Sequence, residues 1–299
     1  MTSVLLTNDD GVESPGLAAL YEELRAVADV TVVAPAEDHS GVGRARSRSV
    51  AVDDHEWGYV VDGTPADCVA YGVDGLDTAF DLVVSGCNLG PNCGAYVMGH
   101  SGTVGAVVEG AFLGVPGVAV SGYHREELFP PEGFTYHVPA TATRRLVEHG
   151  TDRGVFDHVD YLSVNVPVET EATYRVTRPL ADYAVAAEST ATEAGSDGGE
   201  AADASAADDG GDAAASDESD RQDASAPADD VRLANDYWAV VSREERFPTP
   251  ADTEANYPPW SDRAAVVDGE IAVSPLHTPQ RPAQVSVVDE LVAVCNDAR

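Results

Sequence analysis

Hydrophobic and polar positions along the first 170 or so residues repeat in a pattern that predicts strands and helices in turn. The apolar runs that predict buried strands are 3–7, 30–34, 81–85, 118–120 and 161–166. The segments whose apolar spacing predicts helices are 14–27, 64–76, 101–112 and 139–149. Ser14-Pro15 supplies an N-cap and a first-turn proline for the first helix. A strand, a helix and a strand within about 35 residues form a βαβ unit, which predicts a parallel sheet.

This alternation predicts an α/β fold with a doubly wound, mostly parallel sheet. We expect residues 1–183 to form the catalytic core. Residues 184–230 form an acidic low-complexity insert with no aromatic residue, and we expect most of it to be disordered. Apolar runs at 231–233, 236–241 and 271–273 predict that order resumes after the insert, and we expect residues 231–299 to complete the domain.

The chain of 299 residues carries 17 basic and 52 acidic residues, a formal net charge of −35. Residues 188–230 account for −13 of this charge, so −22 remains on the rest of the chain. Such a chain repels itself in dilute buffer but is screened within about 3 Å at roughly 1 M salt. The charge therefore indicates adaptation to a salty cytoplasm.

The sequence contains no lysine, and this absence excludes several classes of function. P-loop NTPases, Schiff-base and pyridoxal-phosphate enzymes, protein kinases and receiver domains all depend on a lysine. A sequence-independent nucleic-acid binder is also disfavoured, because it needs clustered positive charge. We expect no nucleic-acid partner.

The four cysteines have neither CxxC spacing nor zinc-like partners, which favours reduced thiols. The first ten residues lack the basic region of a signal peptide, and no apolar run reaches 18 residues. We therefore expect a soluble cytoplasmic protein with no membrane partner.

Three polar clusters follow the first three predicted core strands, where a parallel sheet binds its ligands. They are Asn8-Asp9-Asp10-Gly11, His39-Ser40-Gly41 and Ser85–Asn92. Adjacent Asp9 and Asp10 supply two hard oxygen ligands suited to Mg²⁺ or Mn²⁺, and Ser40 and Asn88 add neutral oxygens. A simple turn is the alternative for the first cluster, because all four of its residues favour turns. Convergence of the three clusters favours a metal site.

Ser101, Gly102 and Thr103 begin a predicted helix after a glycine-rich loop. The free N–H groups of a helix start and two hydroxyls suit a phosphate, although N-capping by Ser101 alone is the alternative. A cation beside a phosphate cradle predicts phosphoryl transfer to water. Arg44, Arg46 and Arg48 either attract an anionic substrate or balance nearby acids in a solvated loop. The histidines lack metal spacing, so packing or solvent exposure is favoured for them.

Five ordered motifs resemble those of the SurE stationary-phase survival family. They are Leu5–Gly11, Val33–Pro35 leading to Ser40-Gly41, Gly63–Val69, Val84–Gly94, and Ser101–Ala106 with Glu109-Gly110. Weaker similarities are Ser163–Pro167, Asp236–Trp238 and Val273–Leu276. The sequence departs from the family at Cys87, a position often held by Ile, and at Gly99-His100, where many members have Tyr.

The resemblance implies a 5′-nucleotidase that hydrolyses nucleoside 5′-monophosphates, with one divalent cation (Mg²⁺ or Mn²⁺) per subunit. It also implies a Rossmann-like core, and a homodimeric or homotetrameric assembly that the C-terminal segment, residues 231–299, mediates. It implies Asp9, Asp10, Ser40 and Asn88 as metal ligands, the same four as above. Asn92 is implied to line the pocket, and we also place Asn8 among the substrate-binding residues. Asp9 and Asp10 are the expected catalytic residues, acting with water activated by the cation.

The same residues also allow or disfavour other activities. A broader phosphomonoesterase or exopolyphosphatase, or a non-catalytic nucleotide-binding module, uses the same residues. A haloacid-dehalogenase phosphatase is disfavoured because Asn8 stands where its nucleophilic aspartate belongs. A dinucleotide oxidoreductase is weaker still, because Gly41-Val42-Gly43 lacks the third glycine.

Overall fold

The computed structural model describes residues 1–181, 184–189, 231–236 and 257–278. The chain divides into two units, Met1–Tyr183 with Tyr237–Arg299, and Ala184–Asp236. The second unit contributes an antiparallel pair, β9 (Ala184–Ser189) with β10 (Val231–Asp236). Strand β9 covers the first six residues of the predicted acidic insert. Residues 190–230, most of the predicted strand 236–241, and the chain after residue 278 lie outside the described residues.

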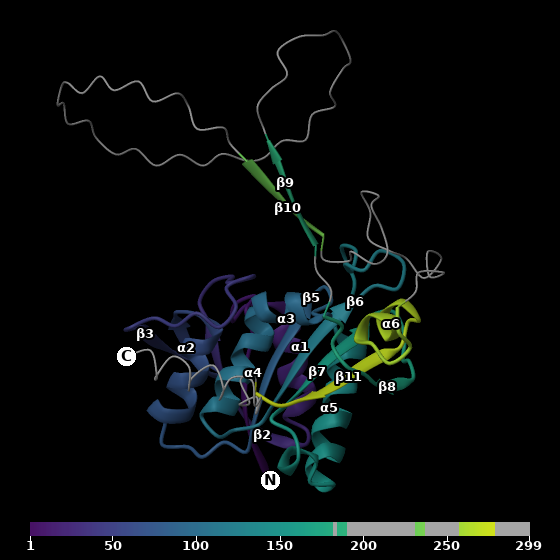
Figure 1. Ribbon diagram of the computed structural model, residues 1–299. Coiled ribbons are helices and arrows are strands. Elements are labelled where there is room, and N and C mark those ends of the chain that lie inside the picture. The colour runs from purple at the N-terminus through teal and green to yellow at the C-terminus, as the bar shows by residue number, and fades with distance from the viewer. Residues whose placement is uncertain (182–183, 190–230, 237–256, 279–299) are drawn as a thin grey trace, which may run out of the picture. The chain divides into compact units, whose positions relative to one another are not determined.

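The first unit is built on one mixed, mostly parallel sheet (Figure 1). Its strand order is β3-β4-β2-β1-β5-β6-β7-β11-β8. The strands are β1 (Thr2–Thr7), β2 (Ala28–Pro35), β3 (Ala51–His55), β4 (Gly58–Asp62), β5 (Leu82–Leu89), β6 (Gly117–Tyr123), β7 (Tyr161–Pro167), β8 (Tyr174–Val176) and β11 (Ile271–Leu276). The six neighbouring strands β4-β2-β1-β5-β6-β7 are all parallel to one another. Strand β3 runs antiparallel to β4, and β11 runs antiparallel to β7.

The chain order reverses beside β1, because β2 lies on one side of it and β5 on the other. In an open parallel sheet such a reversal opens a crevice at the carboxyl ends of the strands, where ligands bind. The polar clusters after β1 and β2, and the cluster Ser85–Asn92 at the end of β5, therefore meet at this edge.

Four of the six described helices begin after a Ser or Thr whose side chain caps the helix. The six are α1 (Pro15–Leu24), α2 (Pro65–Ala70), α3 (Ala95–His100), α4 (Gly102–Phe112), α5 (His137–Asp152) and α6 (Asp262–Val267), with a π turn (Tyr71–Gly75) and a 3₁₀ turn (Val155–Asp157). The capped helices are α1, α2, α4 and α6. Ser14 caps α1 by accepting from the Leu17 N–H at 3.3 Å. Thr64 and Asp67 form a capping box at α2.

Helices cover both faces of the sheet, as a doubly wound fold requires (Figure 1). On one face, Leu17 and Leu20 of α1 and Val147 of α5 pack with Leu6. On the other face, α2 and α4 pack with the side chains that alternate from the first set, Leu5 among them. The predicted α/β fold and its mostly parallel sheet are confirmed.

Several short elements differ from the sequence-based expectation. The hairpin β3–β4, strand β8 and helices α3 and α6 were not predicted, and the helix expected over 64–76 ends at Ala70 before the π turn. Elements of three to six residues are too short to display a period. Among the described residues, no helix has the length and apolar character needed to cross a membrane. Cys68 and Cys87 are buried free thiols, and Cys93 is buried as well.

Candidate functional site

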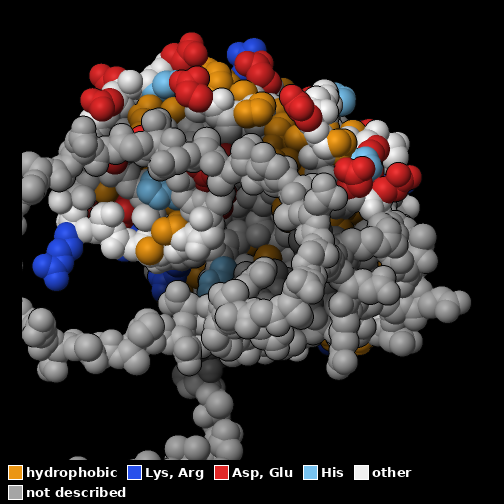
Figure 2. All heavy atoms as spheres, turned by 90° about the horizontal axis from the view of Figure 1, so that it is seen from above, with side chains coloured by type: hydrophobic (Ala, Val, Ile, Leu, Met, Phe, Trp, Pro, Cys, Tyr) orange, Lys and Arg blue, Asp and Glu red, His pale blue; other side chains and the backbone are white. Residues whose placement is uncertain are grey.

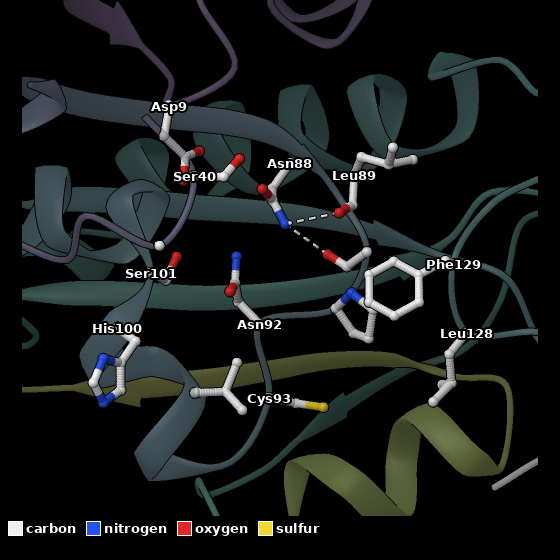
Figure 3. A pocket seen from close by; sticks show the side chains of 14 residues that line it. Asp9, Ser40, Asn88, Leu89, Asn92, Cys93, His100, Ser101, Leu128 and Phe129 are labelled. Carbon is white, nitrogen blue, oxygen red and sulfur yellow. Dashed lines mark hydrogen bonds between the residues drawn. The ribbon is translucent and has the colours of Figure 1, made fainter. Parts of the chain in front are cut away.

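A cavity of about 390 Å³ lies at the carboxyl edge of the sheet beside β1 and β5 (Figure 3). Its lining comes from four places along the chain: Asp9; Ser40 and Gly41; Asn88, Leu89, Gly90, Pro91, Asn92, Cys93, Val97, His100 and Ser101; and Leu128 and Phe129. Five of the sequence-predicted site residues thus line one cavity, namely Asp9, Ser40, Asn88, Asn92 and Ser101.

Asp9 is held against the first turn of α4. Its side chain is almost fully buried, and its Oδ1 accepts a hydrogen bond from the Thr103 hydroxyl at 2.5 Å. A Cβ on Gly102 would lie 2.8 Å from the Asp9 carboxylate, so only glycine permits this approach. Burial raises the pKa of Asp9, and hydrogen bonds from Thr103 partly offset that rise.

Asp10 lies beside the main cavity and lines an adjoining hollow with Asp38 and Tyr136. Burial, followed by the charges of Asp9 and Asp38, raises the pKa of Asp10 to about 7. Its Oδ2 is buried and has no hydrogen-bond partner among the described residues. Two neighbouring carboxylates, the buried Asp9 and the partly buried Asp10, are thus held together at this edge of the sheet.

The loop after β2 is tied to the Asp9 loop by its backbone. The His39 N–H donates to the Asp9 carbonyl at 2.7 Å. The Ser40 N–H and hydroxyl both donate to Asp38 Oδ1, each at 2.7 Å. These bonds hold the exposed Ser40 at the cavity rim, with its hydroxyl hydrogen directed away from the cavity and its oxygen lone pairs available.

Asn88 and Asn92 are positioned through their amide nitrogens. Asn88 Nδ2 donates to the Gly90 carbonyl at 2.8 Å, and Figure 3 shows its Oδ1 on the side facing Ser40. Asn92 Nδ2 donates to the Ser121 hydroxyl at 3.0 Å, and the Asn92 N–H donates to Asn165 Oδ1 at 2.8 Å. The third loop therefore presents one amide oxygen toward the second loop.

Asn8 and Thr103 do not line the cavity, although both were expected to bind substrate. Asn8 is fully buried, and its Nδ2 donates to the Gly11 carbonyl at 2.8 Å and the Ser14 hydroxyl at 2.7 Å. These bonds fasten the Asp9-Asp10 loop to the start of α1. Thr103 and Gly102 lie buried behind Asp9, so Ser101 alone of that trio reaches the cavity.

The arginines after Ser40 have structural partners. Arg44 bonds Glu109 at 2.7 Å, and Arg46 bonds both Glu109 at 2.5 Å and Asp67 at 2.9 Å. The solvated-loop interpretation therefore fits these two better than attraction of substrate. His100 does line the cavity, where its ring lies 4.6 Å from that of Tyr96.

Sequence reasoning missed Leu128 and Phe129, which belong to the loop after β6 and line the cavity. The available signal was an aromatic residue that follows a predicted core strand at the same edge of the sheet. Sequence reasoning also missed Asp38, whose carboxylate accepts the hydrogen bond from the Ser40 hydroxyl.

The donor set fits a hard divalent cation. No group of three or more His, Cys, Asp or Glu side chains able to hold a metal occurs in the described part of the chain. The candidate set instead combines the carboxylates of Asp9 and Asp10 with the neutral oxygens of Ser40 and Asn88, a chemistry that suits Mg²⁺ or Mn²⁺. The unpartnered Oδ2 of Asp10 is an oxygen that a cation would satisfy.

A Rossmann-like sheet with an oxygen-lined cavity beside a helix N-terminus defines an α/β enzyme site suited to a phosphate ester. Comparison with known proteins agrees: the family model "Survival protein SurE" matches residues 4–185. The chain belongs to the SurE family. The expected enzyme class, a phosphoric monoester hydrolase, is confirmed.

Relatives match nearly the whole chain. The 5′-nucleotidase SurE of Haloarcula marismortui is 41% identical over 297 residues, which cover 97% of this chain and 93% of the relative. That of Haloquadratum walsbyi is 40% identical over 309 residues, covering 99% and 98%. The crystal structure of a SurE protein from Aquifex aeolicus superposes with a TM-score of 0.68 at 27% identity, covering 98% of this chain and 99% of that one.

Proposed function

We propose that this protein is a divalent-metal-dependent 5′-nucleotidase that hydrolyses nucleoside 5′-monophosphates to nucleoside and phosphate. The observation that carries the proposal is the pair of adjacent carboxylates, the buried Asp9 and the partly buried Asp10, at the switch point of the sheet beside the N-terminus of α4. The haloarchaeal relatives named as 5′-nucleotidases support the choice of substrate.

Asp9, Asp10, Ser40 and Asn88 are the proposed ligands of one Mg²⁺ or Mn²⁺ ion. A bound cation of this kind polarises a phosphate oxygen and lowers the pKa of the attacking water. The raised pKa values of both carboxylates support the assignment, because they signal buried negative charge that a cation compensates.

Ser101 and Asn92 are the proposed phosphate contacts. The Ser101 hydroxyl oxygen already accepts from the Val104 N–H at 3.1 Å, so its hydrogen remains to donate. Asn92 Nδ2 uses one hydrogen on Ser121 and retains a second. The positive end of the α4 dipole favours an anion at the same place.

Of the two carboxylates, Asp10 is the proposed acceptor of the proton from water, because the Thr103 hydroxyl already donates to Asp9 Oδ1. Asp9 then has the more structural role of the two aspartates, since Thr103 fixes its carboxylate. We further propose a cytoplasmic location and a homodimer or homotetramer, with the C-terminal segment contributing to assembly.

The proposal is tested by phosphate release from the four common nucleoside 5′-monophosphates in molar KCl, with Mg²⁺, Mn²⁺ or EDTA. In Asp9→Asn, Oδ1 can still accept from Thr103, so the variant removes charge while the fold is kept. We expect turnover to fall at least about 100-fold, together with weaker cation binding. Asp53→Asn, on the exposed edge strand β3, is the matched control and keeps full activity.

Any of three outcomes would contradict the proposal. Full metal-dependent turnover by Asp9→Asn would remove Asp9 from the site. Binding of nucleotide without phosphate release by the wild type would indicate a binding module, and faster release from polyphosphate or simple phosphoesters would indicate the broader phosphatase.

A further inference from the structure

The cavity has a polar end and an apolar end. Asp9, Ser40 and Ser101 lie together at one end, and Phe129 lies at the other, with Asn88 between them (Figure 3). Leu89, Pro91 and Leu128 also line the cavity, and Figure 3 shows Leu128 on the same side of the cavity as Phe129. A cavity of 390 Å³ falls in the range of about 300–1,000 Å³ that small-molecule sites occupy. It therefore has room for more than the phosphate that its polar end suits.

The ring of Phe129 is seated on the glycine-rich loop. Gly90 has a φ of +95°, and a Cβ there would lie 2.4 Å from Phe129 Cε1. The ring thus packs directly on the Gly90 backbone, where any other residue would displace it. Even so, the side chain is 47% exposed.

The loop that carries Phe129 is held in one conformation by backbone bonds. His124 and Leu128 exchange two hydrogen bonds of 2.9 Å, and Leu128 adopts a left-handed φ of 62°. The Phe129 N–H donates to the Glu127 carbonyl at 2.8 Å. His124 follows β6 directly, so this turn fixes the ring relative to the sheet edge.

We propose that Phe129 is the platform on which the base of the nucleotide stacks, an inference that rests on the proposed 5′-nucleotidase function. A large aromatic ring that is held in place and half exposed at the cavity wall is the feature that stacks on bases of any sequence. Its place across Asn88 from Asp9 leaves the sugar to lie between the ring and the phosphate end (Figure 3).

The side chains at the Phe129 end of the cavity predict how the enzyme distinguishes between bases. Leu89, Pro91 and Leu128, which line the same cavity as Phe129, bring no side-chain hydrogen-bonding group to the edge of a base. Discrimination therefore depends on the stacking area rather than on base-edge contacts. Purine nucleotides bind more tightly than pyrimidine nucleotides, and adenine and guanine are treated alike.

The experiment compares AMP, CMP and ribose 5-phosphate, which lacks the base, as substrates of the full chain in molar KCl. The wild type shows the lowest KM for AMP, a higher one for CMP and the highest for ribose 5-phosphate. Phe129→Ala raises the KM for AMP about tenfold, toward the value for ribose 5-phosphate. Phe129→Trp preserves the difference, whereas Phe129→Leu keeps apolar bulk on Gly90 but loses the difference.

Phe112 supplies the matched control, because it is 49% exposed and lies outside the cavity lining. Phe112→Ala keeps the wild-type ratio of the two KM values. A ratio that is unchanged in both Phe129→Ala and Phe129→Leu would overturn the platform while leaving the nucleotidase intact. Absence of metal-dependent release from every nucleotide by the wild type would overturn the proposed function itself.

Discussion

Single hydrogen bonds decide how the two aspartates differ. Thr103 donates to Asp9 and lowers its pKa against the effect of burial, whereas no described group does the same for Asp10 Oδ2. Thr103 is fully buried, so it acts on the site through Asp9 and not on a substrate. Asn8 has a comparable role, because it fastens the same loop to Ser14.

Thr103→Val tests this positioning role, because valine keeps the shape and removes only the hydroxyl. Loss of the donor raises the pKa of Asp9, so the acid limb of the pH–rate profile moves to higher pH. We expect cation affinity or kcat to fall about 10- to 100-fold at neutral pH. Metal titrations and pH profiles of the full chain measure both effects.

Thr141→Val is the control for that experiment. The Thr141 hydroxyl is buried on α5 without a hydrogen-bond partner among the described residues. Its removal leaves the pH profile in place. A profile for Thr103→Val that matches the wild type would show that the Thr103 bond does not tune Asp9.

At the scale of elements, α6 supports the loop that carries Asn92. Asp262, at the start of α6, is buried and accepts from the Gly94 N–H at 2.6 Å and from the Leu180 N–H at 3.1 Å. Burial raises the pKa of Asp262. Arg263, also buried, packs so closely on Gly94 that a Cβ there would lie 2.5 Å from its guanidinium. The C-terminal part of the chain thus shapes the cavity wall.

Asp262→Ala is expected to destabilise the protein by about 1–3 kcal/mol, because it leaves the Gly94 N–H without its buried acceptor. The loop that carries Asn92 loosens, so KM for nucleotide rises as well. Asp268→Ala is the control at the other end of the helix, where Asp268 makes a half-exposed ion pair with Arg175. It changes stability by less than about 0.5 kcal/mol.

Chemical denaturation in molar KCl, with KM measured on the same preparations, checks both variants. Equal stabilities for Asp262→Ala and Asp268→Ala would show that the contact from α6 to Gly94 contributes nothing to the fold.

The sequence predicted the long elements and the meeting of the loops, for a clear physical reason. Runs such as 81–85 and the stripe of Leu17, Leu20 and Leu24 display a period, and parallel strands bring their following loops to one edge. Helix α6 has six residues and no such signal. The direction of a side chain carries no sequence signal either, so Asn8 was expected to face the substrate although it faces Ser14.

At the scale of the whole molecule, the net charge of −35 governs the conditions in which the fold is stable. Figure 2 shows Asp and Glu side chains at many separate positions on the visible surface, among side chains of other kinds. Ion pairs offset only part of this charge, since the chain has 17 basic residues for 52 acidic ones. Most of the carboxylates therefore repel one another across distances that salt can screen.

This repulsion predicts that the thermal midpoint rises with KCl concentration. The Debye length falls from about 10 Å at 0.1 M to about 3 Å at 1 M, so most of the gain comes below roughly 1 M. NaCl at equal ionic strength gives the same rise if screening is the cause, since screening depends on ionic strength and not on the identity of the cation. Thermal unfolding across a salt series measures it. A midpoint that is flat between 0.1 M and 1 M would show that the acidic surface does not limit stability, and a rise with KCl alone would indicate specific potassium binding.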